Sequence, residues 1–322
     1  MADELADDEL VDADARESRD SVGVAVEGLS AGLANRPLAP GLYLVATPIG
    51  NLEDITLRAL RVLRSADRIA CEDTRQTQKL LNHYGITTAT VSCHLHNETD
   101  RTRELVEILL RGARIAIVSD AGMPGISDPG MDLAAAAIAE GIAVYPVPGA
   151  NAAISALVAS GLSSSSFFYG GFLPSKAGER RTELERIAAL ATGDHPLTLI
   201  FYEAPHRILD TLADVEAVWG NGCRVVVARE MTKVYEEFLR GAAAVVRAEL
   251  SGRDRIRGEI TLLVEAARRV EAVPEHTSVS KRLEALAAEG LDEKDALKRI
   301  ARERGISKSD AYRELQRERA RR

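Results

Sequence analysis

Short apolar runs and amphipathic segments alternate along residues 41–161. The run at 114–118 is rich in β-branched residues, and each apolar run is followed by a loop and then by a segment that is predicted to be helical. This alternation predicts a parallel sheet covered by helices on both faces. The predicted strands cover 41–46, 67–71, 114–118 and 142–146, with a further strand beginning at Val91. The predicted helices cover 56–64, 76–83, 101–111, 131–140 and a segment that ends at Gly161.

The same alternation continues in a second α/β unit after Gly161 and the serines at 163–166, which indicate a boundary. Its predicted strands cover 167–172, 197–202, 224–228 and 259–264, and its predicted helices lie near 179–191, 205–219 and 242–250. After a linker at 272–278, helices are expected at 279–289, 293–304 and 308–319. We therefore predict a disordered acidic tail (1–39), an N-terminal α/β domain (40–161), a C-terminal α/β domain (162–271) and a helical module (277–322).

The charge is distributed unevenly along the chain. Of the formal net charge of -8, residues 1–36 carry ten acids against three bases, whereas residues 277–322 carry thirteen bases against nine acids. The acidic tail is free of aromatic residues and of sustained periodicity, as is typical of disordered segments. The basic helices suit a nucleic-acid accessory module, and a packing or dimerisation appendage fits the same composition.

Other composition signals exclude some classes of protein. No apolar run approaches the roughly 18 residues that a membrane-spanning helix needs, and no secretory signal is present at the N-terminus. The cysteines Cys71, Cys93 and Cys223 lie far apart in no metal-binding spacing, which predicts free thiols and a cytoplasmic protein. His94 and His96 lack the Cys, Asp or His partners of a metal site, so we expect no metal and interpret them as facing solvent or RNA.

The loop 119–130 is the strongest candidate for ligand binding. It follows the predicted strand 114–118 and contains three glycines, two prolines and the acids Asp120 and Asp128. Ligands of α/β sheets bind at the carboxyl ends of the strands, where glycines permit close backbone approach. Similar loops follow two other strands, at 47–52 and 147–154. The alternative is a tight turn with helix-capping acids. The spacing matches neither the dinucleotide fingerprint nor the P-loop.

Polar residues also end other predicted strands, at 72–75, 203–207 and 229–233. A polar site and helix capping explain the first of these segments equally well. The basic segment 174–181 is compatible with a lid or a phosphate contact, although surface lysines and arginines commonly do no more than solvate a loop.

These motifs together resemble the tetrapyrrole methylase family, and within it the ribose methylases of small-subunit ribosomal RNA. The matching segments, in order, are 47–52, 71–75, 119–130, 147–151, 171–174, 201–207 and 229–233. The resemblance implies two α/β domains of tetrapyrrole methylase type with S-adenosylmethionine (SAM) in the cleft between them, and a homodimer. From the apolar runs alone we expect no membrane partner. The cofactor positions that it implies are Pro48, Gly50, Asp120, Gly122, Met123, Asn151, Ala152, Phe172, Leu173, Glu203, Met231, Ile260 and Thr261.

The resemblance implies SAM-dependent 2′-O-methylation of a cytidine ribose in the decoding region of 16S ribosomal RNA. A ribose hydroxyl is a poor nucleophile, so a general base or a nearby cation should help. The candidate polar groups are Glu72, Asp73, Arg75, Asn97, Glu98, Glu203, His206 and Arg207. Helix caps and interdomain salt bridges are the alternative for these residues. Two alternative functions remain: a tetrapyrrole C-methyltransferase on the same fold, and a non-enzymatic RNA-binding factor.

Overall fold

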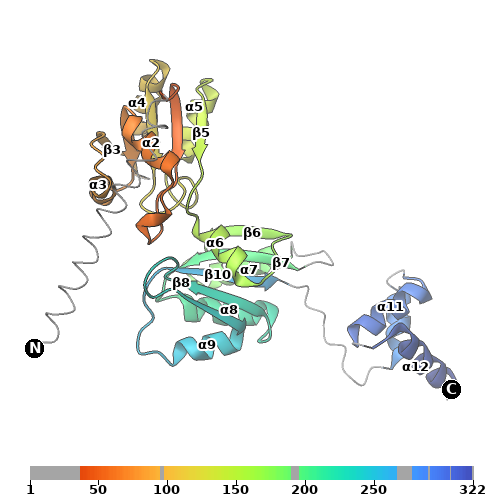
Figure 1. The fold of residues 1–322 in the computed structure, drawn as a ribbon. Coiled ribbons are helices and arrows are strands. Elements are labelled where there is room, and N and C mark those ends of the chain that lie inside the picture. The colour runs from red at the N-terminus through yellow and green to blue at the C-terminus, as the bar shows by residue number, and fades with distance from the viewer. Residues whose placement is uncertain are drawn as a thin grey trace, which may run out of the picture. The chain divides into compact units, whose positions relative to one another are not determined.

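The computed structural model describes residues 37–94, 98–189, 196–266, 278–288, 291–304 and 306–320. The described residues form two compact units, one that ends at Ala266 and a helical one that follows it (Figure 1). Of the predicted acidic tail, residues 1–36 lie outside the described residues, as do His96 and Asn97. No helix in the described part of the chain is long and apolar enough to cross a membrane.

The first sheet of the larger unit is fully parallel, as predicted. Its strand order is β3-β2-β4-β1-β5, and every neighbouring pair is parallel. The strands are β1 (Gly41–Val45), β2 (Arg68–Cys71), β3 (Thr90–Ser92), β4 (Arg114–Val118) and β5 (Val144–Val147). The buried strand β4 matches its prediction, whereas β5 begins and ends slightly later than the predicted 142–146.

Helices cover this first sheet on both faces. The Leu60 and Leu63 side chains pack with Ile69 on one face, and Leu105 and Leu133 join the cluster on the other. Full burial of such an aliphatic side chain contributes roughly 1.5–3 kcal/mol, which makes these two layers the main stabilising contacts. The helical segments are η1 (Leu52–Asp54), α2 (Leu57–Ser65), α3 (Thr74–His83), α4 (Glu98–Leu110) and α5 (Met131–Ala139).

The second sheet is mixed, with the order β6-β7-β10-β8-β9. Only the β6–β7 pair is parallel, and the other three pairs are antiparallel. The strands are β6 (Phe167–Phe172), β7 (Leu197–Glu203), β8 (Arg224–Arg229), β9 (Glu237–Ala242) and β10 (Ile260–Ala266). The edge strand β9 was not predicted, because its short run of mixed polarity resembles a loop.

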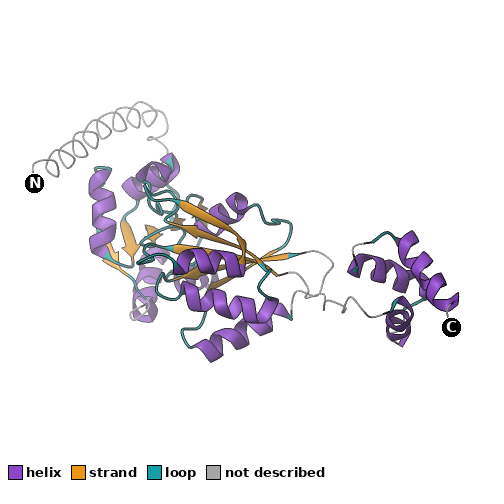
Figure 2. Cartoon of the chain, turned by 90° about the horizontal axis from the view of Figure 1, so that it is seen from below, coloured by secondary structure: helices purple, strands orange, loops and turns teal. Residues whose placement is uncertain are grey.

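Helices also cover both faces of the second sheet, and Figure 2 shows the strands with helices packed around them. One face packs against α7 (Ala177–Ala188), α8 (Ile208–Trp219) and α9 (Ala243–Ser251). The other face packs against α6 (Ala152–Ser160), whose Leu157 contacts the cluster that contains Ile200 and Leu263. Although α6 directly follows the last strand of the first sheet, it therefore belongs by packing to the second sheet.

The C-terminal unit consists of the helices α10 (Val279–Ala288), α11 (Glu293–Glu303) and α12 (Lys308–Ala320) around a core of its own. Ser307 caps the start of α12, since the Asp310 N–H donates to Ser307 Oγ at 3.1 Å. Glu318 accepts from the backbone N–H groups of Val279 and Ser280 at 3.0 and 2.8 Å, which fixes α12 against the start of α10.

Candidate functional site

A cleft of about 900 Å³ opens at the carboxyl ends of the first sheet's strands. Its lining comes from the β1–η1 loop, the start of the β4–α5 loop, helix α3 and the second sheet. The lining residues are Thr47, Pro48, Ile49, Gly50, Leu52, Gln76, Thr77, Lys79, Leu80, Asn82, His83, Ser119, Asp120, Ala121, Lys233 and Glu259. This volume falls within the range of small-molecule and cofactor sites.

Backbone pairing fixes the two loops at the base of the cleft. Thr47 and Gly122 exchange two backbone hydrogen bonds, with N···O distances of 2.9 and 3.0 Å. Gly122 has a φ of +83°, and a Cβ there would lie 3.3 Å from Ile49 Cγ2. A glycine is therefore required both by the backbone conformation and by the close approach of the loops.

The second sheet closes one side of the cleft through the segment between β8 and β9. The Asn51 N–H donates to Thr232 Oγ1 at 3.1 Å, and a Cβ on Gly50 would lie 2.4 Å from Lys233 Cγ. Glu230 and Thr232 have φ angles of 51° and 66°, a left-handed conformation that costs roughly 1–2 kcal/mol for such residues. Strain of this size persists only where surrounding contacts hold it, and here those contacts form the cleft wall.

Lys233 is held in this wall by two glutamates. Its Nζ lies 2.9 Å from Glu230 Oε1 and 3.1 Å from Glu259 Oε2. Glu230 also accepts from the Glu259 backbone N–H at 2.9 Å, and its charge pair with Lys233 contributes to lowering its pKa. The glutamate side chains differ in exposure, at 18% for Glu230 and 74% for Glu259. Glu230 is therefore the structural partner, and Glu259 is the partner that solvent or a ligand can replace.

The predicted acid Asp73 caps helix α3. Its Oδ1 accepts from the Arg75 backbone N–H at 2.8 Å, and its Oδ2 lies 2.8 Å from Arg75 Nη2. These bonds from Arg75 lower the pKa of Asp73 to about 2. The Asp73 N–H in turn donates to Asp120 Oδ1 at 3.2 Å, which joins the ends of β2 and β4. The capping alternative thus describes the contacts of Asp73 and Arg75, while Asp120 lines the cleft.

Two further acids have raised pKa values, Glu72 directly after β2 and Asp128 in the β4–α5 loop. Burial, followed by the charge of Glu72, raises the pKa of Asp128 to about 6. Burial and the charge of Asp120 raise the pKa of Glu72. A carboxyl group with a pKa near 6 can exchange a proton close to neutral pH, which is a requirement of general acid–base catalysis.

The distal part of the β4–α5 loop is bonded to the second sheet. Ser127 Oγ and the Tyr169 hydroxyl are 2.7 Å apart, and the rings of Tyr169 and Phe172 lie edge-on to Tyr202 at centroid distances of 5.4 and 5.7 Å. Phe172 remains 58% exposed. This aromatic group therefore presents an accessible apolar surface beside the loop that carries Asp128.

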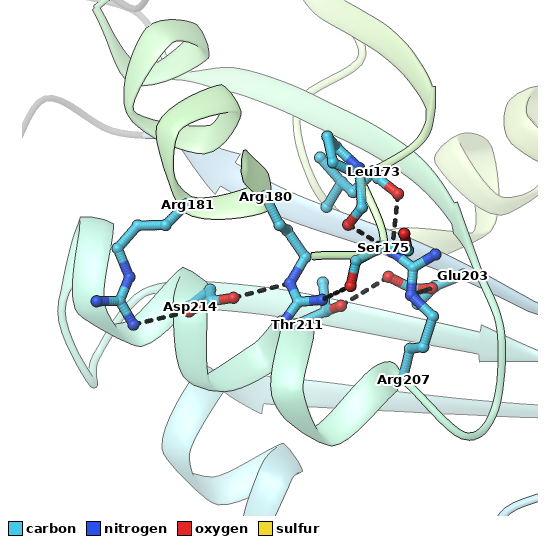
Figure 3. Close-up of polar contacts among 9 residues, drawn as sticks. Leu173, Ser175, Arg180, Arg181, Glu203, Arg207, Thr211 and Asp214 are labelled. Carbon is cyan, nitrogen blue, oxygen red and sulfur yellow. Dashed lines mark hydrogen bonds and ion pairs between the residues drawn. The ribbon is translucent and has the colours of Figure 1, made fainter. Parts of the chain in front are cut away.

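Glu203 and Arg207 form a buried polar network that holds the chain after β6 (Figure 3). Glu203 accepts from the Ala204 N–H at 2.8 Å and from Thr211 Oγ1 at 2.6 Å, and lies 3.2 Å from Arg207 Nε. Arg207 Nη2 donates to the carbonyls of Leu173 and Pro174 at 2.7 and 2.9 Å. Their observed role is to fix the predicted 171–174 segment against α8, while the neighbouring His206 is exposed.

The other predicted cofactor positions are not among the lining residues of the cleft. Met123 follows Gly122 in the same loop, and Asn151 caps α6 by accepting from the Ile154 N–H at 3.0 Å, next to Ala152. Leu173, Met231, Ile260 and Thr261 are buried. Ile260 pairs with Glu203 in the sheet, and Thr261 pairs with Tyr202. Of the predicted set, Pro48, Gly50 and Asp120 line the cleft. Glu98 begins α4.

Sequence reasoning missed one wall of the cleft. The polar face of α3, formed by Gln76, Lys79, Asn82 and His83, lines it together with Lys233. The spacing of Gln76, Lys79 and His83 places these three residues on one helix face. This spacing is the sequence pattern from which a polar wall could have been predicted. Among the described residues, no group of three or more His, Cys, Asp or Glu is arranged to hold a metal ion.

Comparisons with known proteins agree on one family. The model of the family "Tetrapyrrole (Corrin/Porphyrin) Methylases" matches residues 41–246. The "Ribosomal RNA small subunit methyltransferase I" of Halalkalibacterium halodurans is 50% identical over 275 residues, which span 84% of this chain and 93% of that protein. The protein of the same name from Bacillus subtilis is 43% identical over 84% of this chain and 92% of its own length.

Solved structures agree at the level of the fold. A cobalt precorrin-4 methyltransferase superposes with a TM-score of 0.51 at 16% identity, over 70% of this chain and 94% of its own. A diphthine synthase gives a TM-score of 0.52 at 14% identity, over 70% of this chain and 89% of its own. The predicted fold class, with two α/β sheets of tetrapyrrole methylase type, is confirmed.

Proposed function

The chain belongs to the tetrapyrrole (corrin/porphyrin) methylase family, and from this premise we propose that it uses SAM to methylate a ribose 2′-hydroxyl of small-subunit ribosomal RNA. The observation that carries the proposal is identity of 43–50% over 84% of the chain to proteins named for that RNA. The predicted acceptor is a cytidine of the 16S decoding region. A tetrapyrrole acceptor is the competing outcome of the experiment below.

The strand-end loops suit the chemistry of SAM, which bears a sulfonium and an ammonium group. The exposed carboxylate of Asp120 offers a partner for a cation or a hydroxyl group. Gly122 lets the backbone of the β4–α5 loop approach Ile49 closely, because a Cβ at position 122 would lie 3.3 Å from Ile49 Cγ2. We propose that Asp120, Gly122 and Met123 hold the donor from the first sheet. Phe172, whose side chain is exposed, would contact it from the second.

When bound, SAM supplies a methyl group that its sulfonium activates for transfer. The chain must orient the ribose hydroxyl and receive its proton as the new O–C bond forms and the S–C bond breaks. We propose that Asp128, with its pKa of about 6 beside Glu72, receives this proton. The contacts of Asp73, Glu203 and Arg207 indicate positioning of backbone segments instead.

The C-terminal helical unit supports an RNA acceptor over a porphyrinoid. Residues 277–322 carry thirteen bases against nine acids, and basic surfaces bind RNA phosphates by releasing counterions. Ribosomal RNA as substrate also leads us to propose a cytoplasmic site of action. We further propose the homodimer that the resemblance implies, which sedimentation of the purified protein would test.

A methyl-transfer assay tests the function directly. The purified chain is incubated with tritiated SAM and, separately, small ribosomal subunits, protein-free 16S RNA and a porphyrinogen. Nuclease digestion and mass spectrometry then locate the methyl group. Label on a ribose of the RNA supports the proposal, whereas label on the porphyrinogen alone supports the competing function. SAM binding without transfer to any of the three acceptors overturns both. Asp120→Ala serves as the matched variant with an impaired donor site.

A further inference from the structure

The polar face of α3 forms a wall of the cleft to which neither the sequence motifs nor the relatives' names assign a role. Gln76, Lys79 and His83 lie on one face of the helix, and Asn82 lies beside them. The side chains of Gln76, Lys79 and Asn82 are exposed, so they do not contribute to the core. All four side chains can donate hydrogen bonds from nitrogen. A ligand rich in acceptor atoms therefore matches this wall.

Lys79 carries the charge of this wall. In the part of the chain that the structure describes, Lys79 has no ion-pair partner. An exposed ammonium group on a cleft wall, with no carboxylate to neutralise it, is suited to a phosphate. The other lysine of the lining, Lys233, is bonded to the exposed carboxylate of Glu259, which an incoming phosphate can replace.

Asn82 is oriented by its neighbour on the helix. Gln78 Nε2 donates to Asn82 Oδ1 at 2.8 Å. This bond engages the amide oxygen, which leaves the NH₂ group of Asn82, a residue of the cleft lining, as the group to donate to a ligand. An NH₂ group pairs with an acceptor, and the Watson–Crick edge of a pyrimidine offers a carbonyl oxygen and, in cytosine, a ring nitrogen. Unpaired bases in RNA loops are recognised through these edges.

We propose that the α3 wall is the acceptor-nucleotide subsite of the cleft, where Lys79 contacts a backbone phosphate and Asn82 donates to the base of a single-stranded RNA segment. The inference rests on the proposed function, because it takes RNA as the acceptor. The RNA would thus occupy the α3 side of the cleft, where Lys79 and Asn82 contact it.

Variants of Lys79 test the phosphate contact. Lys79→Ala and Lys79→Glu should raise KM for small ribosomal subunits by about 5-fold and more than 10-fold, because a phosphate contact is lost or opposed. The slope of log affinity against log salt should fall by about 0.7–0.9. Lys79→Arg should retain most of the affinity. SAM affinity, measured by calorimetry, should stay constant in all three variants. Arg186→Ala, which removes an exposed cation of α7 bound to Glu183, is the matched control.

Variants of Asn82 test the base contact. Asn82→Asp replaces a donor with an acceptor and should lower kcat/KM for subunits more than Asn82→Ala does, with the melting temperature of both variants monitored. If the wild-type chain methylates subunits and all Lys79 and Asn82 variants match it in KM and salt slope, this inference is overturned while the proposed function stands. A wild-type chain that transfers no methyl group to RNA overturns both.

Discussion

Replacing Asp128 with asparagine should stabilise the protein at neutral pH and at the same time reduce methyl transfer. The pKa of this carboxyl is raised from 3.8 to about 6, mainly by burial and then by the charge of Glu72. A raised pKa means that the folded state prefers the protonated form. The stabilising contribution of Asp128 is therefore fully present below pH 3.8 and is lost as the pH rises through 6.

The size of the effect follows from the shift. Two pKa units at about 1.4 kcal/mol each give roughly 3 kcal/mol as the maximal penalty of ionising Asp128. Because this carboxyl is only partly buried, solvent screening reduces the value to about 1–2 kcal/mol. At about 2–4 °C per kcal/mol for a unit of this size, Asp128→Asn should raise the melting temperature at pH 7.5 by roughly 2–8 °C.

Two measurements on the same variant check this reasoning. Thermal melting of Asp128→Asn and wild type at pH 7.5 and pH 5 should show a larger gain at pH 7.5, where the wild-type carboxyl is ionised. Single-turnover methyl transfer should fall by about 10²-fold or more if the carboxyl receives the ribose proton. An equal or negative change of melting temperature at both pH values would refute the electrostatic argument. Full activity would refute the catalytic one. Glu183→Gln, in an exposed pair with Arg186, is the control.

Three further predictions follow from the contacts. Gly50→Ala places a Cβ 2.4 Å from Lys233 Cγ, so we expect a loss of about 1–3 kcal/mol in unfolding free energy and weaker substrate binding; unchanged melting and kinetics would contradict the close approach. Glu203→Ala leaves Arg207 without its buried partner and should cost about 3–5 kcal/mol in chemical denaturation, against less than ~1 kcal/mol for the exposed Glu183→Ala. A chain that ends at residue 272 should have the same melting temperature of the α/β unit as the full chain, because that unit has its own cores. Its KM for small ribosomal subunits should rise. A lower melting temperature or an unchanged KM would contradict this prediction.

Local pattern was sufficient to predict the parallel first sheet. After Arg114, the strand β4 consists of consecutive apolar residues before a glycine-rich loop, and this signal lies within a few residues of the chain. The second sheet was harder to predict. The pairing of β10 between β7 and β8 joins residues far apart in sequence, and no local period encodes that order. The edge strand β9 pairs on one side only and carries Glu237, Arg240 and Gly241 among its residues, so it lacks the apolar signature of a buried strand.

The candidate site was predictable in its loops but not in its walls. Gly122 and Asp120 stand out because they lie in a long loop rich in glycine and proline at the carboxyl end of a buried strand, where ligands of α/β sheets bind. The position of Lys233 depends on the left-handed backbone conformation of Glu230 and Thr232. Because neither residue is a glycine, the local sequence gives no signal for this conformation. For Asp73 the sequence left a polar site and helix capping equally open, and the structure shows the capping contacts.

The packing of α6 has a practical consequence for dividing the protein. Since α6 follows β5 in the chain but lies on the second sheet, a cut at the predicted boundary of Gly161 would separate this helix from the surface that it shields. The C-terminal fragment would then expose the apolar side chains of Ile200, Val226 and Leu263 to water and would be prone to aggregate. Fragments meant for separate expression or for reassembly reporters are better divided in the turn at Gly149–Asn151, so that the helix stays with its sheet.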